Sequence, residues 1–166
     1  MGRDARTNDS TRTSTRPFDH RLGDPSKVTE HAPFLWHASR VVVIGMGMEL
    51  LRLDEVRRQL EEGGAAFATT TWTTAERALC FARKDPAPGL AARLAAKIAA
   101  LSALGRPEGA TALEVEVVRA SSGKPGLVLA GLAARAAADM GVSSMHVTLT
   151  HAEDHVLALV MFEGER

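Results

Sequence analysis

The stretch AARLAAKIAALSALG, residues 91–105, decides the fold of this chain. Alanine pairs recur every four residues, apolar residues stand on both sides of Lys97, and Gly105 closes the stretch. Alanine has the highest helix propensity, and a glycine just after the last turn commonly ends a helix. The stretch therefore predicts a long central helix over residues 90–104.

The segments before this helix predict one strand and two further helices. RVVVIGMGMEL (40–50) is rich in β-branched residues and predicts a strand that is buried on both faces at its start. LDEVRRQLEEGG (53–64) has apolar residues at helical spacing, and its Gly-Gly pair predicts that the helix stops there. TTWTTAERALCFARK (70–84) contains Thr73 and, three residues later, Glu76, which is a capping-box pattern for another helix.

The segments after the central helix predict mostly strands. ALEVEVVRA (112–120) and LVLAG (127–131) flank the turn SSGKPG and predict a hairpin. LAARAAADMG (132–141) predicts a short helix, and MHVTLTHAEDHVLALVMFEG (145–164) predicts two strands joined across HAED. The order β-α-α-α-β-β-α-β-β is typical of an α+β domain with a mainly antiparallel sheet around a long helix.

Composition limits the classes of function. The 166 residues are 45% hydrophobic and 24% charged with zero net charge, which favours a globular domain and predicts no nucleic-acid or membrane partner. Cys80 is the single cysteine, which excludes an internal disulfide and, with no membrane-length apolar run, favours a cytoplasmic location. Residues 1–39 are polar and predict a flexible extension, so the domain is expected over residues 40–166.

Three short segments carry candidate functional residues. Glu49 follows two glycines at the end of a strand, where a carboxylate can bind a metal, act as a base, or only face solvent. His151 falls where a strand ends, and Lys124 at a hairpin tip suits either a phosphate contact or solvent. His146 lies in mid-strand, as a core or interface histidine does. The glycines of GMGMEL lack the third glycine of a dinucleotide fingerprint.

In this order the segments resemble the holo-acyl-carrier-protein synthases, the small 4′-phosphopantetheinyl transferases. The resemblance runs from about residue 41 to the end and rests on the Gly-x-Gly strand ahead of an acid, the AARLAAKIAALSALG helix, the GKP hairpin and the HVTLTH strand. It implies the 4′-phosphopantetheinyl transferase fold, a homotrimer with active sites between subunits, coenzyme A binding, and an acyl carrier protein as partner. The implied reaction moves phosphopantetheine from coenzyme A to a carrier-protein serine with Mg²⁺.

The chain departs from the family at positions that the resemblance assigns to the active site. Two carboxylates are expected to bind magnesium; Glu49 stands where the family has Asp, but Ile98 replaces the second ligand, a Glu. Ser102 stands where the family commonly has a lysine. Glu55 stands where the family has an arginine that binds the carrier protein, and Arg52 stands where the family usually has a Glu.

Other family residues are retained, which indicates a repurposed site. Those expected to bind the coenzyme A arm are Arg93, Lys97, Lys124 and Pro125. With Lys97 as a further catalytic residue, Glu49 and His151 suit metal-independent acid–base chemistry that needs no cofactor. The hypothesis is dehydration, cyclisation or isomerisation of a polyketide-like or fatty-acid-type acyl chain tethered to a carrier protein or coenzyme A.

Two alternatives remain open from the sequence. The first is a true transferase using Mg²⁺ and coenzyme A, in which Glu49 and a nearby acid rebuild the metal site; the candidate acids are Glu76, Glu153 and Asp154. The second is a non-catalytic module that binds a carrier protein.

Overall fold

A computed structural model describes residues 41–165, and the predicted extension over residues 1–39 lies outside this part. The elements are β1 (Val41–Arg52), α1 (Leu53–Thr71), α2 (Thr74–Phe81), α3 (Ala87–Ala103), the 3-10 turn η2 (Ala112–Glu114), β2 (Val115–Arg119), β3 (Pro125–Leu129), α4 (Gly131–Asp139), β4 (Val142–Ala152) and β5 (His155–Glu165). The predicted α+β class and the predicted order of elements are confirmed. No helix in this described part is long and apolar enough to cross a membrane.

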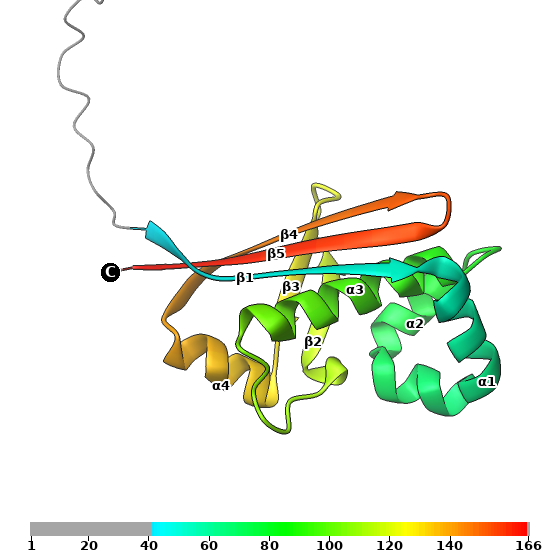
Figure 1. Ribbon diagram of the computed structural model, residues 1–166, viewed down its shortest axis with the longest axis horizontal. Coiled ribbons are helices and arrows are strands. Elements are labelled where there is room, and N and C mark those ends of the chain that lie inside the picture. The colour runs from blue at the N-terminus through cyan, green and yellow to red at the C-terminus, as the bar shows by residue number, and fades with distance from the viewer. Residues whose placement is uncertain (1–40, 166) are drawn as a thin grey trace, which may run out of the picture. The chain divides into compact units, whose positions relative to one another are not determined.

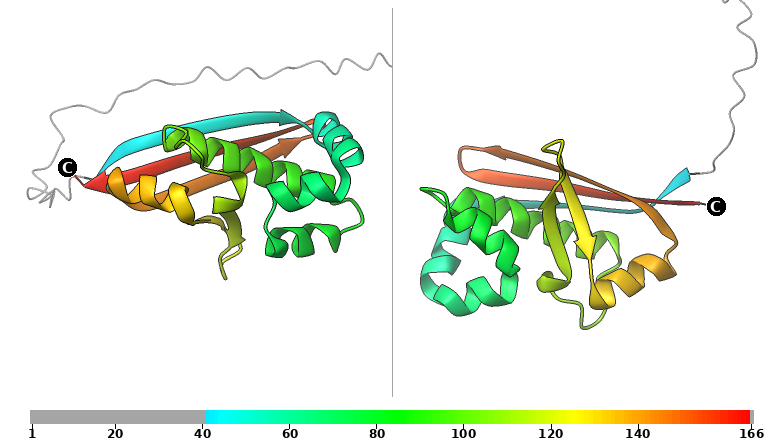
Figure 2. Two further views of the ribbon diagram at one scale, coloured as in Figure 1. Left: turned by 90° about the horizontal axis from the view of Figure 1, so that it is seen from below. Right: turned by 180° about the vertical axis from the view of Figure 1, so that it is seen from behind.

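All strand pairs are antiparallel and form two sheets. One sheet has the strand order β1-β5-β4, and the other is the β2-β3 hairpin. Helix α3 lies across one face of the three-stranded sheet, with α1 and α2 at one end and α4 at the other (Figure 1). The hairpin contacts both α3 and β4, so the long helix is enclosed as predicted. Figure 2 shows the opposite face of the three-stranded sheet without a covering element in the described chain.

The uncovered sheet face corrects the prediction that β1 is buried on both faces at its start. Val41 and Val43 are exposed, and further along the same face Met46 and Met48 are 66% and 65% exposed. The error arises because apolar residues occupy both alternating sets of β1, so the sequence shows no difference between the covered and the uncovered face.

The covered face of β1 lies unusually close to α3. A Cβ atom on Gly47 would overlap the carbonyl oxygen of Ala99, and one on Gly45 would lie 2.5 Å from the carbonyl oxygen of Ala103. The alanines of α3 are correspondingly buried; those with no exposed surface are Ala91, Ala95, Ala96, Ala99 and Ala100. The central helix therefore rests on the strand through backbone and methyl groups.

Helix α3 ends as its sequence predicts. Gly105 adopts a φ of 76°, and its N–H donates to the carbonyl of Ser102 at 3.0 Å. The N–H of Arg106 donates to the carbonyl of Leu101 at 2.8 Å, which completes a Schellman motif.

The predicted stop at the Gly-Gly pair is confirmed. The first helical segment of α1 ends at Gly64, whose φ of 51° and ψ of −139° are not helical, and a second segment then runs to Thr71 across this kink. Phe67 packs edge-on against Trp72 with ring centroids 5.2 Å apart. The buried Trp72 indole donates to the carbonyl of Leu90 at 3.0 Å. This packing stabilises the second helical segment, which was not predicted, because most helical stability comes from tertiary contacts.

Replacing Gly47 by alanine tests the close approach of strand and helix. Because the new methyl group would overlap the Ala99 carbonyl, we expect the free energy of unfolding to fall by about 2–3 kcal/mol in urea titrations followed by circular dichroism. Gly126→Ala on β3 is the control, since its added Cβ would lie 3.4 Å from Val118, an ordinary contact. We expect that control to change stability by less than about 0.5 kcal/mol. Equal losses for the two variants would contradict the prediction.

Candidate functional site

Lys97 is the most buried charge on α3. Its side chain has no exposed surface, and its ammonium donates to the carbonyls of Val115 at 2.5 Å and Ala112 at 2.8 Å. It also forms an ion pair with Glu76 at 2.8 Å. Burial lowers the pKa of Lys97, and the neighbouring carboxylate acts in the opposite direction. The ammonium thus makes its hydrogen bonds and its ion pair with groups inside the fold.

Glu76 joins this interior network to two backbone segments. One carboxylate oxygen accepts from the N–H of Val117 at 2.9 Å, and the other accepts from the N–H of Thr73 at 2.9 Å. The Thr73 hydroxyl accepts in return from the Glu76 N–H, so the predicted capping box is confirmed. A carboxylate engaged in this way is not available to rebuild a magnesium site.

The helical wheel separates Lys97 from the position of the replaced metal ligand. Successive residues are rotated by about 100°, so Lys97 and Ile98 point to different sides of α3, whereas Ile98 and Ser102 point to the same side. Ile98 and Ser102 are half-buried and line a hollow of about 250 Å³. The structure therefore places Lys97 apart from the side chains around this hollow.

Glu49 lies on the face of β1 that α3 covers. Gly45 faces Ala103 of α3, and Gly47 faces Ala99. Two residues along the strand thus correspond to about one turn of the helix, and the same step places Glu49 beside Ala95. Its side chain is half-buried. Ala95 precedes Ile98 by three residues on α3, and a shared site of Glu49 and Ile98 remains a prediction.

His151 stands farther away on the same sheet. Glu49 pairs with Ala158 of β5, whereas His151 of β4 pairs with Val156, so β5 separates the two side chains. Two strand spacings and a two-residue offset along the strands place the backbones about 12 Å apart. Within one chain, a substrate would have to bridge this separation for both groups to act on it.

Arg93 is joined by a second arginine that sequence reasoning missed. The Nη1 of Arg93 donates to the carbonyl of Gly89 at 3.0 Å, and its Nε is buried without a partner. A Cβ on Gly89 would lie 3.7 Å from Nη1 of both Arg83 and Arg93. Neither guanidinium has a carboxylate partner within residues 41–165. Two adjacent arginines without a carboxylate partner suit an anionic ligand. The sequence feature that could have indicated Arg83 is its place in a basic Arg83-Lys84 pair shortly before α3.

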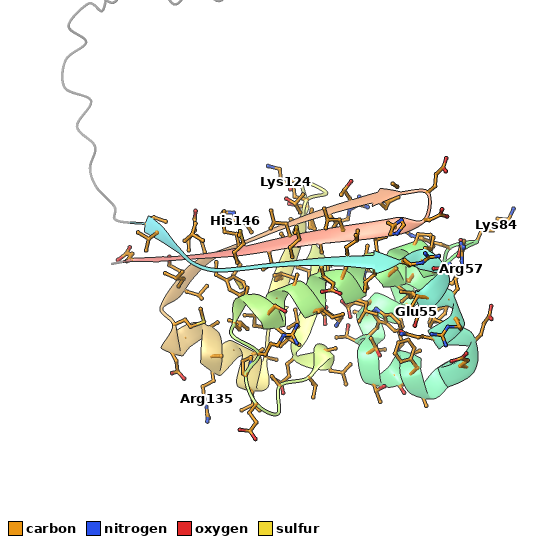
Figure 3. All side chains as sticks on the ribbon, viewed as in Figure 1. Glu55, Arg57, Lys84, Lys124, Arg135 and His146 are labelled. Carbon is orange, nitrogen blue, oxygen red and sulfur yellow. The ribbon has the colours of Figure 1, made fainter. Side chains whose placement is uncertain are left out.

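Lys124 and Pro125 lie at the tip of the β2-β3 hairpin. Both are exposed, and the N–H of Ala120 closes the turn by donating to the Lys124 carbonyl at 2.9 Å. Figure 3 shows Lys124 away from Glu55 and Arg57, which lie at the α1 end. Within one chain, Lys124 therefore lies away from the start of α1.

The rearranged charges at the start of α1 pair with one another. Arg52 bonds Asp54 through two contacts, at 2.5 and 3.0 Å, and this holds the pKa of the Asp54 carboxyl at about 2. Glu55 pairs with Arg58 at 2.6 Å, which lowers the pKa of that glutamate. These pairs are solvent-exposed, so they add little stability.

A magnesium site with two carboxylates does not fit the residues of one chain. Glu49 offers one carboxylate, and Ile98 offers only carbon atoms. Within residues 41–165, no three His, Cys, Asp or Glu side chains lie together so that they could hold a metal ion.

Comparisons with known proteins agree on one family. No family model matches the chain. The holo-[acyl-carrier-protein] synthase of Anaeromyxobacter sp. (strain K) is 42% identical over 126 residues, which cover 74% of this chain and 98% of that protein. The crystal structure of the Neisseria meningitidis synthase is 25% identical with a TM-score of 0.67, over 73% of this chain and 98% of that one. The Helicobacter pylori synthase in complex with coenzyme A shares the fold at a TM-score of 0.61 and 18% identity, over 70% and 98% of the chains.

Replacing Lys97 by methionine separates a structural role from a purely chemical one. The change leaves the Glu76 carboxylate buried without its cation, so we expect the free energy of unfolding to fall by about 3–5 kcal/mol in urea titrations. Lys124→Met is the control, since this exposed lysine has no buried partner, and we expect a change below about 0.5 kcal/mol. Full stability of the Lys97 variant would show that the buried pair does not hold the fold.

Proposed function

Because this chain belongs to the holo-[acyl-carrier-protein] synthase family, we propose that it transfers 4′-phosphopantetheine from coenzyme A to a serine of an acyl carrier protein. The continuous match over nearly the whole length of the Anaeromyxobacter relative carries this proposal. The relatives offer no support for dehydration or cyclisation chemistry, so the transferase alternative takes precedence over the repurposed site.

The chemistry assigns roles to residues of this chain. The serine oxygen attacks the phosphorus that carries the pantetheine arm, and the bond from that phosphorus to the adenosine bisphosphate breaks. Glu49 takes the serine proton, since it is a half-buried carboxylate beside α3. Arg93 and Arg83 bind a phosphate group of coenzyme A, because their guanidinium groups have no carboxylate partner in the described chain.

Magnesium is the family's usual source of charge neutralisation, yet the residues of one chain do not fit it. The proposed transfer therefore relies on side chains of the protein. With Ile98 in place of a carboxylate, the developing phosphate charge is met by cations of the protein, and we expect slow transfer.

A homotrimer with shared sites is part of the proposal. The uncovered face of the sheet carries exposed apolar side chains; those on β1 and β5 are Val41, Val43, Met46, Met48, Leu50 and Leu159. Such a patch suits burial against further copies of the chain. The separation of Glu49, His151 and Lys124 within one chain also supports a site completed by a neighbouring copy.

His146 lies on this uncovered face, which corrects the interpretation of His146 as a core histidine. It is exposed and bonds Glu163 at 2.9 Å, so it is not a core histidine. Its interface role remains a prediction that follows from the proposed trimer.

Transfer is tested by intact-mass spectrometry of apo carrier proteins incubated with coenzyme A, Mg²⁺ and this protein. We expect the carrier to gain one phosphopantetheine slowly, and Ile98→Glu to raise the rate at least roughly tenfold by adding the missing carboxylate. Leu113→Glu, at an exposed apolar residue of η2, is the control for an added charge and should leave the rate unchanged. Failure of every apo carrier protein to gain the group would contradict the proposed transfer.

Assembly is tested by sedimentation velocity. We expect the unmodified protein to sediment as three copies, and Met48→Lys to shift it toward one copy, because a buried lysine in an apolar interface is costly. Leu79→Lys on α2 is the control and should remain trimeric, since Leu79 is equally apolar but lies away from the sheet face. A single copy of the unmodified protein at micromolar concentration would overturn the trimer.

The repurposed acid–base chemistry is the second candidate, and one observation favours it. Ile98 and Ser102 line the hollow beside α3, and neither can bind a metal as a carboxylate does. This candidate predicts no phosphopantetheine gain, but conversion of an acylated carrier protein that Glu49→Gln and His151→Ala abolish. Binding of a carrier protein without any conversion would instead support the non-catalytic module.

A further inference from the structure

The hollow beside the C-terminal half of α3 contains one charged side chain. The hollow measures about 250 Å³, and the residues that line it are Ile98, Leu101, Ser102, Arg106, Pro107 and Ala110. Arg106 is the charged residue among them, and it belongs to the loop that follows α3. Because Ile98 lines the same hollow, the Arg106 side chain and the Ile98 side of α3 face one space.

The other cations considered for the site lie elsewhere in the described chain. Lys97 is buried and paired inside the fold, and Lys124 is exposed at the tip of the β2-β3 hairpin. The Arg93 guanidinium donates to the carbonyl of Gly89 at 3.0 Å, so it points toward the start of α3. Of these cations and Arg106, only Arg106 lines the hollow.

Arg106 is held at the hollow by an unusual backbone conformation. Its φ is 54°, the one positive φ outside glycine in residues 41–165. A side chain in this left-handed region is unfavourable, whereas glycine adopts the same conformation without steric cost. The hydrogen bond from the Arg106 N–H to the Leu101 carbonyl needs no side chain at this position. An arginine thus stands where the backbone favours glycine, and strained positions of this kind cluster at functional sites.

The Arg106 guanidinium is available to a ligand. The residue is exposed, and within residues 41–165 it takes part in no ion pair. A guanidinium presents a planar set of N–H donors that matches two oxygens of a phosphate group. The Ser102 hydroxyl lines the same hollow and can donate one further hydrogen bond. The hollow therefore offers donors to a phosphoryl group on the side of α3 that lacks a carboxylate for a metal.

We propose that Arg106 is a catalytic residue of the transfer, and that it neutralises charge on the reacting phosphoryl group in place of a metal ion. The inference rests on the proposed function, since it takes the reacting phosphorus to lie between Glu49 and the Ile98 side of α3. As the serine oxygen bonds to the phosphorus, Glu49 accepts the serine proton. The bond to the adenosine bisphosphate breaks, and the leaving phosphate keeps the electron pair. Arg106 donates to the phosphoryl oxygens, over which the negative charge is spread in the transition state.

Replacing Arg106 by glycine separates a chemical role from a structural one. In single-turnover transfer to an apo carrier protein, followed by intact-mass spectrometry, we expect this variant to be about a hundredfold slower. It should melt at an equal or higher temperature, because glycine removes the unfavourable backbone conformation. Arg106→Lys should recover part of the rate, since lysine keeps the charge but not the paired donors. Arg135→Ala is the control, because this exposed arginine of α4 does not line the hollow, and it should keep the full rate.

Magnesium distinguishes the guanidinium from a metal ion as the source of positive charge. We expect chelation of divalent ions to slow the unmodified protein by less than about threefold, because Arg106 supplies the charge. In the Ile98→Glu variant, Mg²⁺ should raise the rate at least roughly tenfold, and adding Arg106→Gly should then cost less than about tenfold. Isothermal titration should show that Arg106→Gly changes the affinity for coenzyme A by less than about threefold, since the contact strengthens in the transition state.

The outcomes separate this inference from the proposed function. An unmodified protein that modifies the carrier, with an Arg106→Gly variant that transfers equally fast, would overturn the inference and leave the proposed function intact. A loss of coenzyme A affinity as large as the loss of rate would overturn the catalytic role, because the residue would then bind substrate and transition state alike. No transfer by the unmodified protein to any apo carrier protein would overturn both.

Discussion

The buried ion pair between Lys97 and Glu76 is the interaction on which the described domain depends. It joins the middle of α3 to the first turn of α2, and through backbone hydrogen bonds it also fixes η2 and β2. Each member is costly to bury alone, but together they satisfy one another and four main-chain groups. A residue that family resemblance suggested for chemistry thus serves first to hold four elements in place.

Close packing between α3 and the sheet determines what remains for function. Glycines on β1 and alanines on α3 occupy most of the contact between strand and helix, so functional side chains must lie at the edges of that contact. Ile98 and Ser102 line an uncharged flank of α3, whereas Arg83 and Arg93 lie together near the start of the helix. The described chain therefore has an apolar hollow on one part of α3 and a pair of arginines without a carboxylate partner on another.

Much of the fold could be predicted from the sequence, because local signals marked most boundaries. Thr73 with Glu76 marked α2, Gly105 marked the end of α3, and alternation marked the hairpins. The Gly-Gly pair marked the break at Gly64, but the second helical segment up to Thr71 was not predicted, since its packing involves residues farther along the chain. For the candidate site, a shared role of Glu49 and Ile98 remains a prediction from the resemblance, and the interior position of Lys97 could not be predicted because it depends on a partner twenty-one residues away.

The glycine and alanine contact between β1 and α3 also affects how the protein responds to temperature. Side chains this small bury little hydrocarbon for each residue, so a larger share of the buried surface is peptide backbone. Exposure of apolar surface raises the heat capacity of the unfolded state, while exposure of polar surface lowers it. This contact therefore contributes less to the heat-capacity change of unfolding than a contact between larger apolar side chains would.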